Sequence, residues 1–431
     1  MRITGTVVAD ASTVIEDGAV VTDGDIVFVG DREMAAEQHP DHEARSFDIV
    51  APGFVNAHIH SVQSLARGVA DDAELLEWLF EHILPMEARM DNEATAIAAL
   101  LGYLECLESG VTTVVDHPTV EHTGEVFDAA AVTGIRAVLG KVLMDTNAPA
   151  ELREDTDEAL SESQRLLDAY HDTCDGRLQY AVTPRFAVTC TEACLRGARD
   201  LADRHDGVRI HTHASENRSE VATVREDTGR SNIAWLHEVG LTGEDVLLAH
   251  CVWTSADERD LLAETGTNVI HCPSANMKLA SGIAPVPEYL ERGVEVGLGN
   301  DGPPCNNTLD PFAEMRQASL LARVDRLDAT AMEAKAVLEM ATVGGARAAG
   351  LDRVGRLEPG WRADVIGIST DAARATPVHD PRSHLVFAAR GDDVAFTMVD
   401  GTVVYDGTPT RIDGAAVRAR AQELAAELQE N

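Results

Sequence analysis

Two histidines one residue apart are the first candidates for chemistry in this chain. His58 and His60 end a β-prone run that begins at Gly53. Side chains at positions i and i+2 of a strand face the same side, so both imidazoles can bind one metal ion. Histidines at this spacing are often structural, so the pair indicates a metal site only if other strand ends supply further ligand residues.

Two further strand ends supply such matches. The run that ends at His213 is followed by Glu216, whose carboxylate can handle the protons of an activated water. His211 has the same parity as His213, so spacing does not choose the ligand; the alternative for His211 is a buried, hydrogen-bonded strand histidine.

His250 and Asp301 follow two later runs. Asp301 offers an oxygen ligand that can also accept a proton, and His250 can orient the water or polarise the group under attack. Four ligands from this set would leave one position on the ion open, as in catalytic zinc sites.

These side chains need a scaffold that gathers strand ends. Polar residues collect at the C-terminal ends of eight expected β-runs, at residues 53–58, 111–115, 136–142, 178–183, 208–213, 246–250, 267–271 and 294–298. Eight strands close a (β/α)8 TIM barrel, whose active site lies at those ends. A doubly wound open sheet is the alternative, but no glycine-rich nucleotide motif follows any run.

The two ends of the chain have a different pattern of β-prone and turn residues from the central region. Short β-prone runs separated by turn residues occupy residues 1–51 and 351–410, and they are expected to share one small β-sandwich. The predicted fold class is therefore α/β: a metal-dependent TIM barrel at residues 52–350 with a sandwich from both ends. Residues 411–431 are predicted to form a packing helix.

Composition narrows the function classes. The net charge is −38, from 35 Lys and Arg against 73 Asp and Glu, which excludes nucleic-acid binding through a basic surface. No apolar stretch approaches the roughly 18–20 residues of a membrane span, and no signal peptide is recognisable. Seven cysteines without CxxC spacing indicate reduced thiols. We expect a cytoplasmic protein without membrane or nucleic-acid partners. The sequence does not decide whether the chain forms a homo-oligomer.

The acid excess coincides with a scarcity of lysine, which occurs only at positions 141, 278 and 335. We interpret this as halophilic adaptation to molar salt, which screens the self-repulsion; an acidic mesophilic protein is the alternative. The chain should melt at a lower temperature in dilute buffer than in molar KCl, and equal melting in both would refute the interpretation.

The motifs together resemble the amidohydrolase superfamily over almost the whole chain. They are Pro52-Gly53-Phe54-Val55-Asn56-Ala57-His58-Ile59-His60, the His213 and Glu216 pair, Ala249-His250, His271-Cys272-Pro273-Ser274-Ala275-Asn276, Gly299-Asn300-Asp301 and Gly355-Arg356-Leu357-Glu358-Pro359-Gly360. The chain is most similar to the mononuclear-metal deaminases that act on 5′-deoxyadenosine, S-adenosylhomocysteine, methylthioadenosine or guanine, together with the triazine hydrolases.

The resemblance implies one divalent ion, with Zn²⁺ expected and Fe²⁺ as the alternative. The implied ligands are His58, His60, His213 and Asp301. Glu216 would be the proton shuttle, and His250 would assist attack. Binuclear members carry a carbamylated lysine at the end of the fourth strand, where this chain has none. Lys141, at the third strand, is expected to serve packing or a local ion pair.

Substrate features point in two directions. In the adenosine-type deaminases that the chain resembles, the glutamate matching Glu87 binds the ribose hydroxyls, and a carboxylate can accept both protons. Gln63 and Arg185 resemble residues that contact the base in guanine deaminase. The combination of several motifs is most similar to 5′-deoxyadenosine deaminases: Pro184-Arg185-Phe186, His213-Ala214-Ser215-Glu216-Asn217, Ala249-His250-Cys251-Val252-Trp253, Pro304-Cys305-Asn306-Asn307 and Gly140-Lys141-Val142-Leu143-Met144-Asp145. Arg185 can equally be an ion-pair partner that stabilises the fold.

The implied reaction is hydrolytic deamination of an adenosine-type nucleoside in purine salvage, with Glu216 protonating the ring nitrogen and the amine leaving as ammonia. Guanine deamination and a triazine-type aminohydrolase or chlorohydrolase reaction are the alternatives. A barrel that has lost catalysis is the non-enzymatic alternative, and it is disfavoured because every expected ligand is present.

Overall fold

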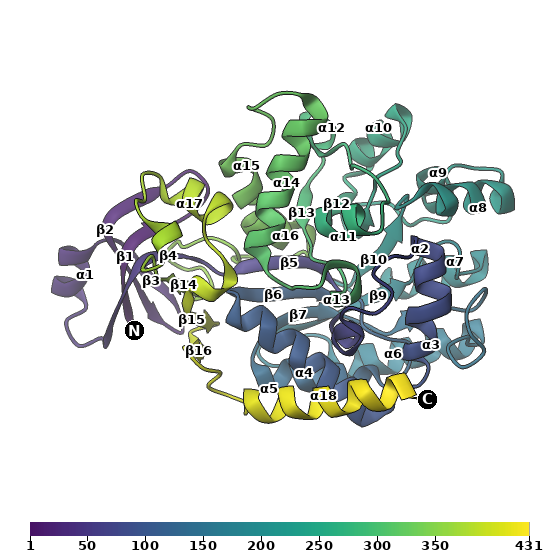
Figure 1. Ribbon diagram of the computed structural model, residues 1–431, viewed down its shortest axis with the longest axis horizontal. Coiled ribbons are helices and arrows are strands. Elements are labelled where there is room, and N and C mark those ends of the chain that lie inside the picture. The colour runs from purple at the N-terminus through teal and green to yellow at the C-terminus, as the bar shows by residue number, and fades with distance from the viewer. Residues whose placement is uncertain (431) are drawn as a thin grey trace.

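Eight parallel strands form a barrel at the centre of the computed structural model, which describes residues 1–430 (Figure 1). They are β5 (Phe54–Ile59), β6 (Val111–Asp116), β7 (Arg136–Leu139), β9 (Leu178–Pro184), β10 (Arg209–Ala214), β11 (Val246–His250), β12 (Asn268–His271) and β13 (Val296–Leu298). Consecutive barrel strands pair in sequence order, and a parallel bridge between Ile59 and Asp301 joins the last strand to the first. The predicted TIM barrel is confirmed.

The third predicted run is interrupted. It is divided into β7 and the short β8 (Val142–Leu143), which pairs with β9. A Cβ on Gly140, between the two, would lie 1.8 Å from the carbonyl oxygen of Ala181. Only glycine allows the chain to pass this close to β9, so the β-prone composition of 136–142 does not give one continuous strand.

Helices cover the outside of the barrel and occupy its loops. The longer ones are α4 (Asn92–Glu108), α5 (Thr123–Thr133), α6 (Thr156–Tyr170), α7 (Glu192–Ala202), α8 (Arg218–Thr228), α10 (Ala256–Thr265) and α14 (Pro311–Arg326). The shorter ones are η1 (Ser61–Ala66), α2 (Leu75–Glu77), η2 (Trp78–Ile83), α3 (Leu84–Glu87), α9 (Asn232–Glu238), α11 (Pro273–Lys278), α12 (Val286–Glu291), α13 (Pro303–Asn306), α15 (Ala334–Glu339), η3 (Met340–Gly344) and α16 (Gly345–Ala348).

Local sequence explains why these helices form and which face they bury. In α6 the side chain of Asp155 caps the N-terminus by accepting hydrogen bonds from two backbone amides. Ala159, Ser163 and Leu166 are buried, at the spacing of one helix face. The opposite, acidic face stays in water.

Both chain ends form one continuous seven-stranded sheet, seen in purple and yellow in Figure 1. Its order is β16 (Thr402–Asp406), β15 (Val394–Val399), β14 (Val365–Ile368), β4 (Ala44–Pro52), β1 (Arg2–Val8), β2 (Val14–Asp23) and β3 (Asp25–Asp31). β1 and β4 pair in parallel and the other neighbours are antiparallel. Residues from both ends, among them Ile3, Val20, Val365 and Phe396, share one apolar core.

The remaining helices connect strands of this sheet or pack on the barrel. α1 (Arg32–Gln38) follows β3, and η4 (Ala373–Ala375), α17 (Pro381–Phe387) and η5 (Gly391–Asp393) lie between β14 and β15. α18 (Gly414–Glu430) packs along α4, as Figure 1 shows in yellow. Residue 431 of the predicted helix lies outside the described residues. Within residues 1–430, no helix combines the length and apolarity needed to cross a membrane.

A buried ion pair ties the barrel to the sheet. The guanidinium of Arg136, on β7, donates to both carboxylate oxygens of Asp364 at 3.1 and 3.2 Å, and contacts Asp400 at 3.4 Å. Removing one partner of such a pair would leave a buried charge uncompensated, which typically costs about 3–5 kcal/mol of stability. The pair therefore fixes the small sheet against the barrel.

Candidate active site

The strand-end histidines and Asp301 converge at the C-terminal mouth of the barrel. Asp301 Oδ1 lies 3.4 Å from Nε2 of His58 and 3.3 Å from Nε2 of His60. His60 Nε2 lies 3.1 Å from His213 Nε2, and His250 Nε2 lies 3.7 Å from Asp301 Oδ2. All five side chains are buried.

A tight turn after β13 places Asp301. Its amide donates to the carbonyl of His58, and Asn56 on β5 hydrogen-bonds both the amide and the side chain of Asn300. A Cβ on Gly299 would lie 2.8 Å from the Cβ of His58, so this position needs glycine. Asp301 itself has a φ of 64°, in the left-handed region that costs a non-glycine residue about 1–3 kcal/mol. The fold thus stores backbone strain at this carboxylate.

Hydrogen bonds fix which nitrogen of each imidazole carries the proton. Nδ1 of His60 faces the carbonyl of His117 at 2.6 Å, and Nδ1 of His213 faces the carbonyl of Arg185 at 2.7 Å. A carbonyl oxygen can only accept, so in both rings Nδ1 carries the proton and Nε2 presents a lone pair to the cluster. Such partners orient metal-ligating histidines.

His250 is oriented in the same way by a side chain. Its Nδ1 lies 2.9 Å from Oδ1 of the buried Asn276 on α11. His58 contacts another histidine instead, with its Nδ1 2.9 Å from Nε2 of His211. His211 is therefore a buried, hydrogen-bonded histidine beside a candidate ligand.

The cluster fits a bound cation. Burial lowers the pKa of His58 to about 4 and that of His213 well below its usual value, so these imidazoles are neutral. Nε2 of His58 and of His250 have no hydrogen-bond partner, although both are buried. Lone pairs from neutral imidazoles and a carboxylate that face one another repel unless a cation lies between them, and a divalent metal ion suits this donor set.

The structure brings together five donors where the sequence predicts four ligands. The predicted set is His58, His60, His213 and Asp301, whereas the donor atoms of His58, His213, His250 and Asp301 all lie within 4.8 Å of one another. His60 is close to the same atoms, as given above. The assignment of His60 as ligand and His250 as assistant stays a prediction.

Two carboxylates in the site have opposite proton affinities. Glu216 Oε2 lies 3.5 Å from His250 Nε2, and burial, followed by the charge of Asp301, raises the pKa of Glu216 well above its usual value. Burial would also raise the pKa of Asp301, but contacts with His58 and His60 outweigh it and lower that pKa. When the pKa values of two carboxyl groups in one site are shifted in opposite directions, the one with the raised pKa can carry a proton and the other stays an anion.

The three candidate substrate residues form a buried network. Nε2 of Gln63 donates to Glu87 Oε1 at 2.8 Å, and a guanidinium nitrogen of Arg185 lies 3.2 Å from Glu87 Oε2. At most 5% of any of these residues is exposed. Arg185 is thus an ion-pair partner, as the sequence allowed, and its partner is the candidate ribose-binding carboxylate.

A narrow pocket lies beside the candidate ligands and beside Arg185 of the network. Its polar wall consists of His60, His213, Glu216, Asp301 and Arg185. Its apolar wall consists of Leu75, Trp78, Leu79 and Phe186, three of them from the loop helices α2 and η2. An apolar pocket with a few convergent polar groups is typical of a small-molecule site.

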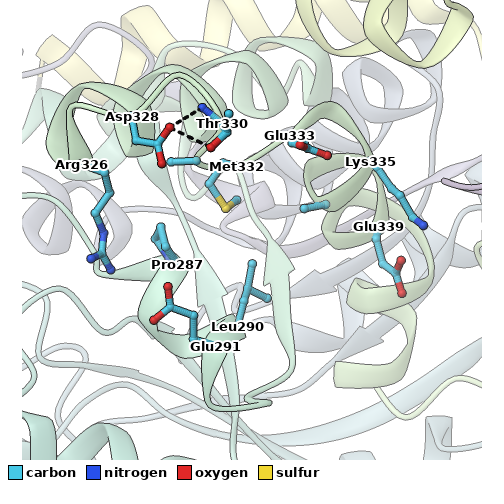
Figure 2. A pocket seen from close by; sticks show the side chains of 12 residues that line it. Pro287, Leu290, Glu291, Arg326, Asp328, Thr330, Met332, Glu333, Lys335 and Glu339 are labelled. Carbon is cyan, nitrogen blue, oxygen red and sulfur yellow. Dashed lines mark hydrogen bonds between the residues drawn. The ribbon is translucent and has the colours of Figure 1, made fainter.

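A wider hollow lies on another part of the surface, between α12, α15 and the end of α14 (Figure 2). Its charged lining consists of the carboxylates of Glu291, Asp328, Glu333 and Glu339 and the cations of Arg326 and Lys335, and it contains no histidine. Glu291 belongs to the segment that leads into β13, so this hollow is near the amino ends of the strands. Barrel enzymes carry out chemistry at the opposite ends.

Two groups shape the site although no role in it was predicted for them from the sequence. Asn276, and also Trp78 and Leu79, belong to motifs of the resemblance, and Leu75 to none. The three apolar side chains lie in the short helices α2 and η2, which have no strand-end polarity to mark them. Lys141 behaves as expected: it is buried, and its Nζ lies 2.7 Å from a carboxylate oxygen of Glu154.

Known proteins resemble this chain over nearly its full length. The profile of the amidohydrolase family matches residues 49–404. A 5′-deoxyadenosine deaminase of Methanopyrus kandleri is 37% identical over 434 residues, covering 99% of each chain. A 5-methylthioadenosine/S-adenosylhomocysteine deaminase of Halobacterium salinarum is 40% identical, covering 99% of this chain and 98% of the relative.

Solved structures of deaminases are also similar to this chain over nearly its full length. A zinc-bound adenosine deaminase from Xanthomonas campestris is similar with a TM-score of 0.92 and 32% identity, covering 100% of this chain and 98% of that one. The guanine deaminase of E. coli is similar with a TM-score of 0.88 and 29% identity, covering 94% and 99%.

Proposed function

Since the chain belongs to the amidohydrolase family, we propose that it is a metal-dependent hydrolytic deaminase of an adenosine-type nucleoside, releasing ammonia and the inosine-type product. One observation carries the proposal. A single pocket is lined by His60, His213 and Asp301 of the cluster, by Glu216 and by Arg185, and Arg185 in turn bonds the buried Glu87. A substrate in this pocket would therefore contact the reacting groups and lie next to the side chain that holds the candidate ribose-binding carboxylate.

A divalent ion, with Zn²⁺ as our proposal, would be held by His58, His60, His213 and Asp301 and would supply a Lewis acid that activates water. The chain's own residues then manage protons. Glu216 is a proton carrier in the cavity wall and would deliver a proton to the purine ring nitrogen as the ring carbon is attacked. Nε2 of His250 would accept a hydrogen bond from the attacking water. It is free to do so because the ring proton is on Nδ1, which donates it to Oδ1 of Asn276.

The network around Glu87 favours a nucleoside over guanine. In the guanine interpretation Gln63 and Arg185 contact the base, yet both side chains bond Glu87. A carboxylate held by both oxygens is prepared to accept the two hydroxyl protons of a ribose. The relatives named above as deaminases of 5′-deoxyadenosine and of methylthioadenosine or S-adenosylhomocysteine support this reading of the site.

Ammonia release tests the proposal. The zinc-loaded protein is assayed in molar KCl with 5′-deoxyadenosine, methylthioadenosine, S-adenosylhomocysteine, adenosine and guanine side by side. Atrazine is the triazine control, and because its dechlorination releases no ammonia, its loss is followed by chromatography. We expect ammonia from the adenosine group, none from guanine, and no loss of atrazine. Turnover of guanine alone would mean that Gln63 and Arg185 contact the base, and turnover of atrazine alone would favour a triazine-type hydrolase.

A further inference from the structure

We propose that Arg185 and Gln63 are positioning residues, which orient the carboxylate of Glu87 for the ribose diol and do not contact the base. The inference rests on the proposed function, because it assigns Glu87 to the ribose. It differs from the base-reading role that the same two residues suggest in the sequence.

The geometry of the carboxylate carries the proposal. Gln63 donates to one oxygen of Glu87 and Arg185 to the other, at 2.8 and 3.2 Å. Each carboxylate oxygen has two lone pairs, so one acceptor site on each oxygen stays available for a hydroxyl. Two donors on opposite oxygens also prevent rotation of the carboxylate plane. A flexible glutamate is thereby preorganised for a diol.

Burial explains why the charge partner is needed. Glu87 and Arg185 are 5% and 3% exposed, and a buried carboxylate is costly unless a hydrogen-bonded cation compensates it. The guanidinium of Arg185 supplies that charge at 3.2 Å. If the guanidinium instead turned to a purine base, Glu87 would lose its compensating charge.

Both positioning residues are anchored beside candidate ligands. The carbonyl oxygen of Arg185 accepts hydrogen bonds from Nδ1 of His213 at 2.7 Å and from Oγ1 of Thr212 at 3.1 Å. The amide of Gln63 packs so closely on Gly302, next to Asp301, that a Cβ there would lie 2.1 Å from Gln63 Oε1. The ribose contact is thus placed at a set position relative to the reacting centre.

The experiment compares one substrate with the diol and one without it. Kinetic constants for adenosine and 2′,3′-dideoxyadenosine are measured for the wild type and for Arg185→Met. The contact of Arg185 with His213 is made by the main chain and does not depend on the side chain. We expect KM for adenosine to rise roughly 10- to 100-fold, the range of a lost charged hydrogen bond, with kcat within about threefold. For dideoxyadenosine, kcat/KM should change less than about threefold.

Controls separate this role from others. Gln63→Leu, which removes the second donor, should show the same dependence on the diol with a smaller rise in KM. This variant tests the inference if Arg185→Met does not fold. Arg225→Met, at an exposed position on α8, should match the wild type. Metal content is measured for each variant and should be unchanged.

Two results would overturn the inference. An equal loss on both substrates would show that Arg185 acts on the base or on the fold, and a loss of bound metal would show that it acts on the ligand cluster. A wild type that deaminates guanine and no adenosine nucleoside would overturn the proposed function itself, which separates the two failures.

Discussion

Replacement of Glu216 by glutamine is expected to lower kcat for deamination by about a thousandfold or more, since positioned acid–base groups contribute about 10²- to 10⁴-fold. The amide has the size of the carboxyl group and keeps its place in the cavity wall. It cannot carry the proton between the water and the ring nitrogen. Metal content and substrate affinity, measured by elemental analysis and calorimetry, should stay near those of the wild type.

A matched control makes the assignment specific. Glu226→Gln removes one negative charge from the exposed surface of α8 and should keep full activity. If Glu216→Gln retains more than about a tenth of wild-type kcat, Glu216 is not the proton shuttle. If it loses the metal instead, Glu216 belongs to the ligand set.

The second large effect concerns the metal. Chelation followed by desalting should abolish turnover, because the ion supplies the Lewis acid. Adding Zn²⁺ should restore activity, and restoration by Fe²⁺ but not by Zn²⁺ would contradict the proposed ion. Full activity in a protein shown to be free of metal would refute the metal-dependent mechanism.

Single replacements then decide between His60 and His250. We expect His60→Ala to lose the bound ion, measured as metal per chain, and His250→Ala to retain it while losing turnover. The structure makes this a sharp question, because the donor atoms of His250 and of three predicted ligands lie within 4.8 Å of one another. Retention by His60→Ala together with loss by His250→Ala would exchange their roles.

Much of this architecture follows from local sequence pattern. Buried parallel strands are apolar throughout, as in β11, and their ends carry polar groups, so alternation of β-runs and helices predicted the barrel and the face of the site. His58 and His60 share one face of a strand because of the two-residue period. The continuous run expected at 136–142 was wrong, because a close approach between strands at Gly140 is not visible in composition.

Contacts between distant segments were decided only by tertiary structure. The side chains of Gln63, Glu87 and Arg185 come from two short helices, η1 and α3, and a strand end, and their spacing in sequence gives no sign that they bond one another. The proton positions on His60, His213 and His250 depend on acceptors from His117, Arg185 and Asn276, each on another element. Sequence periodicity therefore determined which residues face the mouth of the barrel, because strand geometry is local. Packing of separate loops decided which partners hold them, because hydrogen bonds depend on distances that only the folded chain sets.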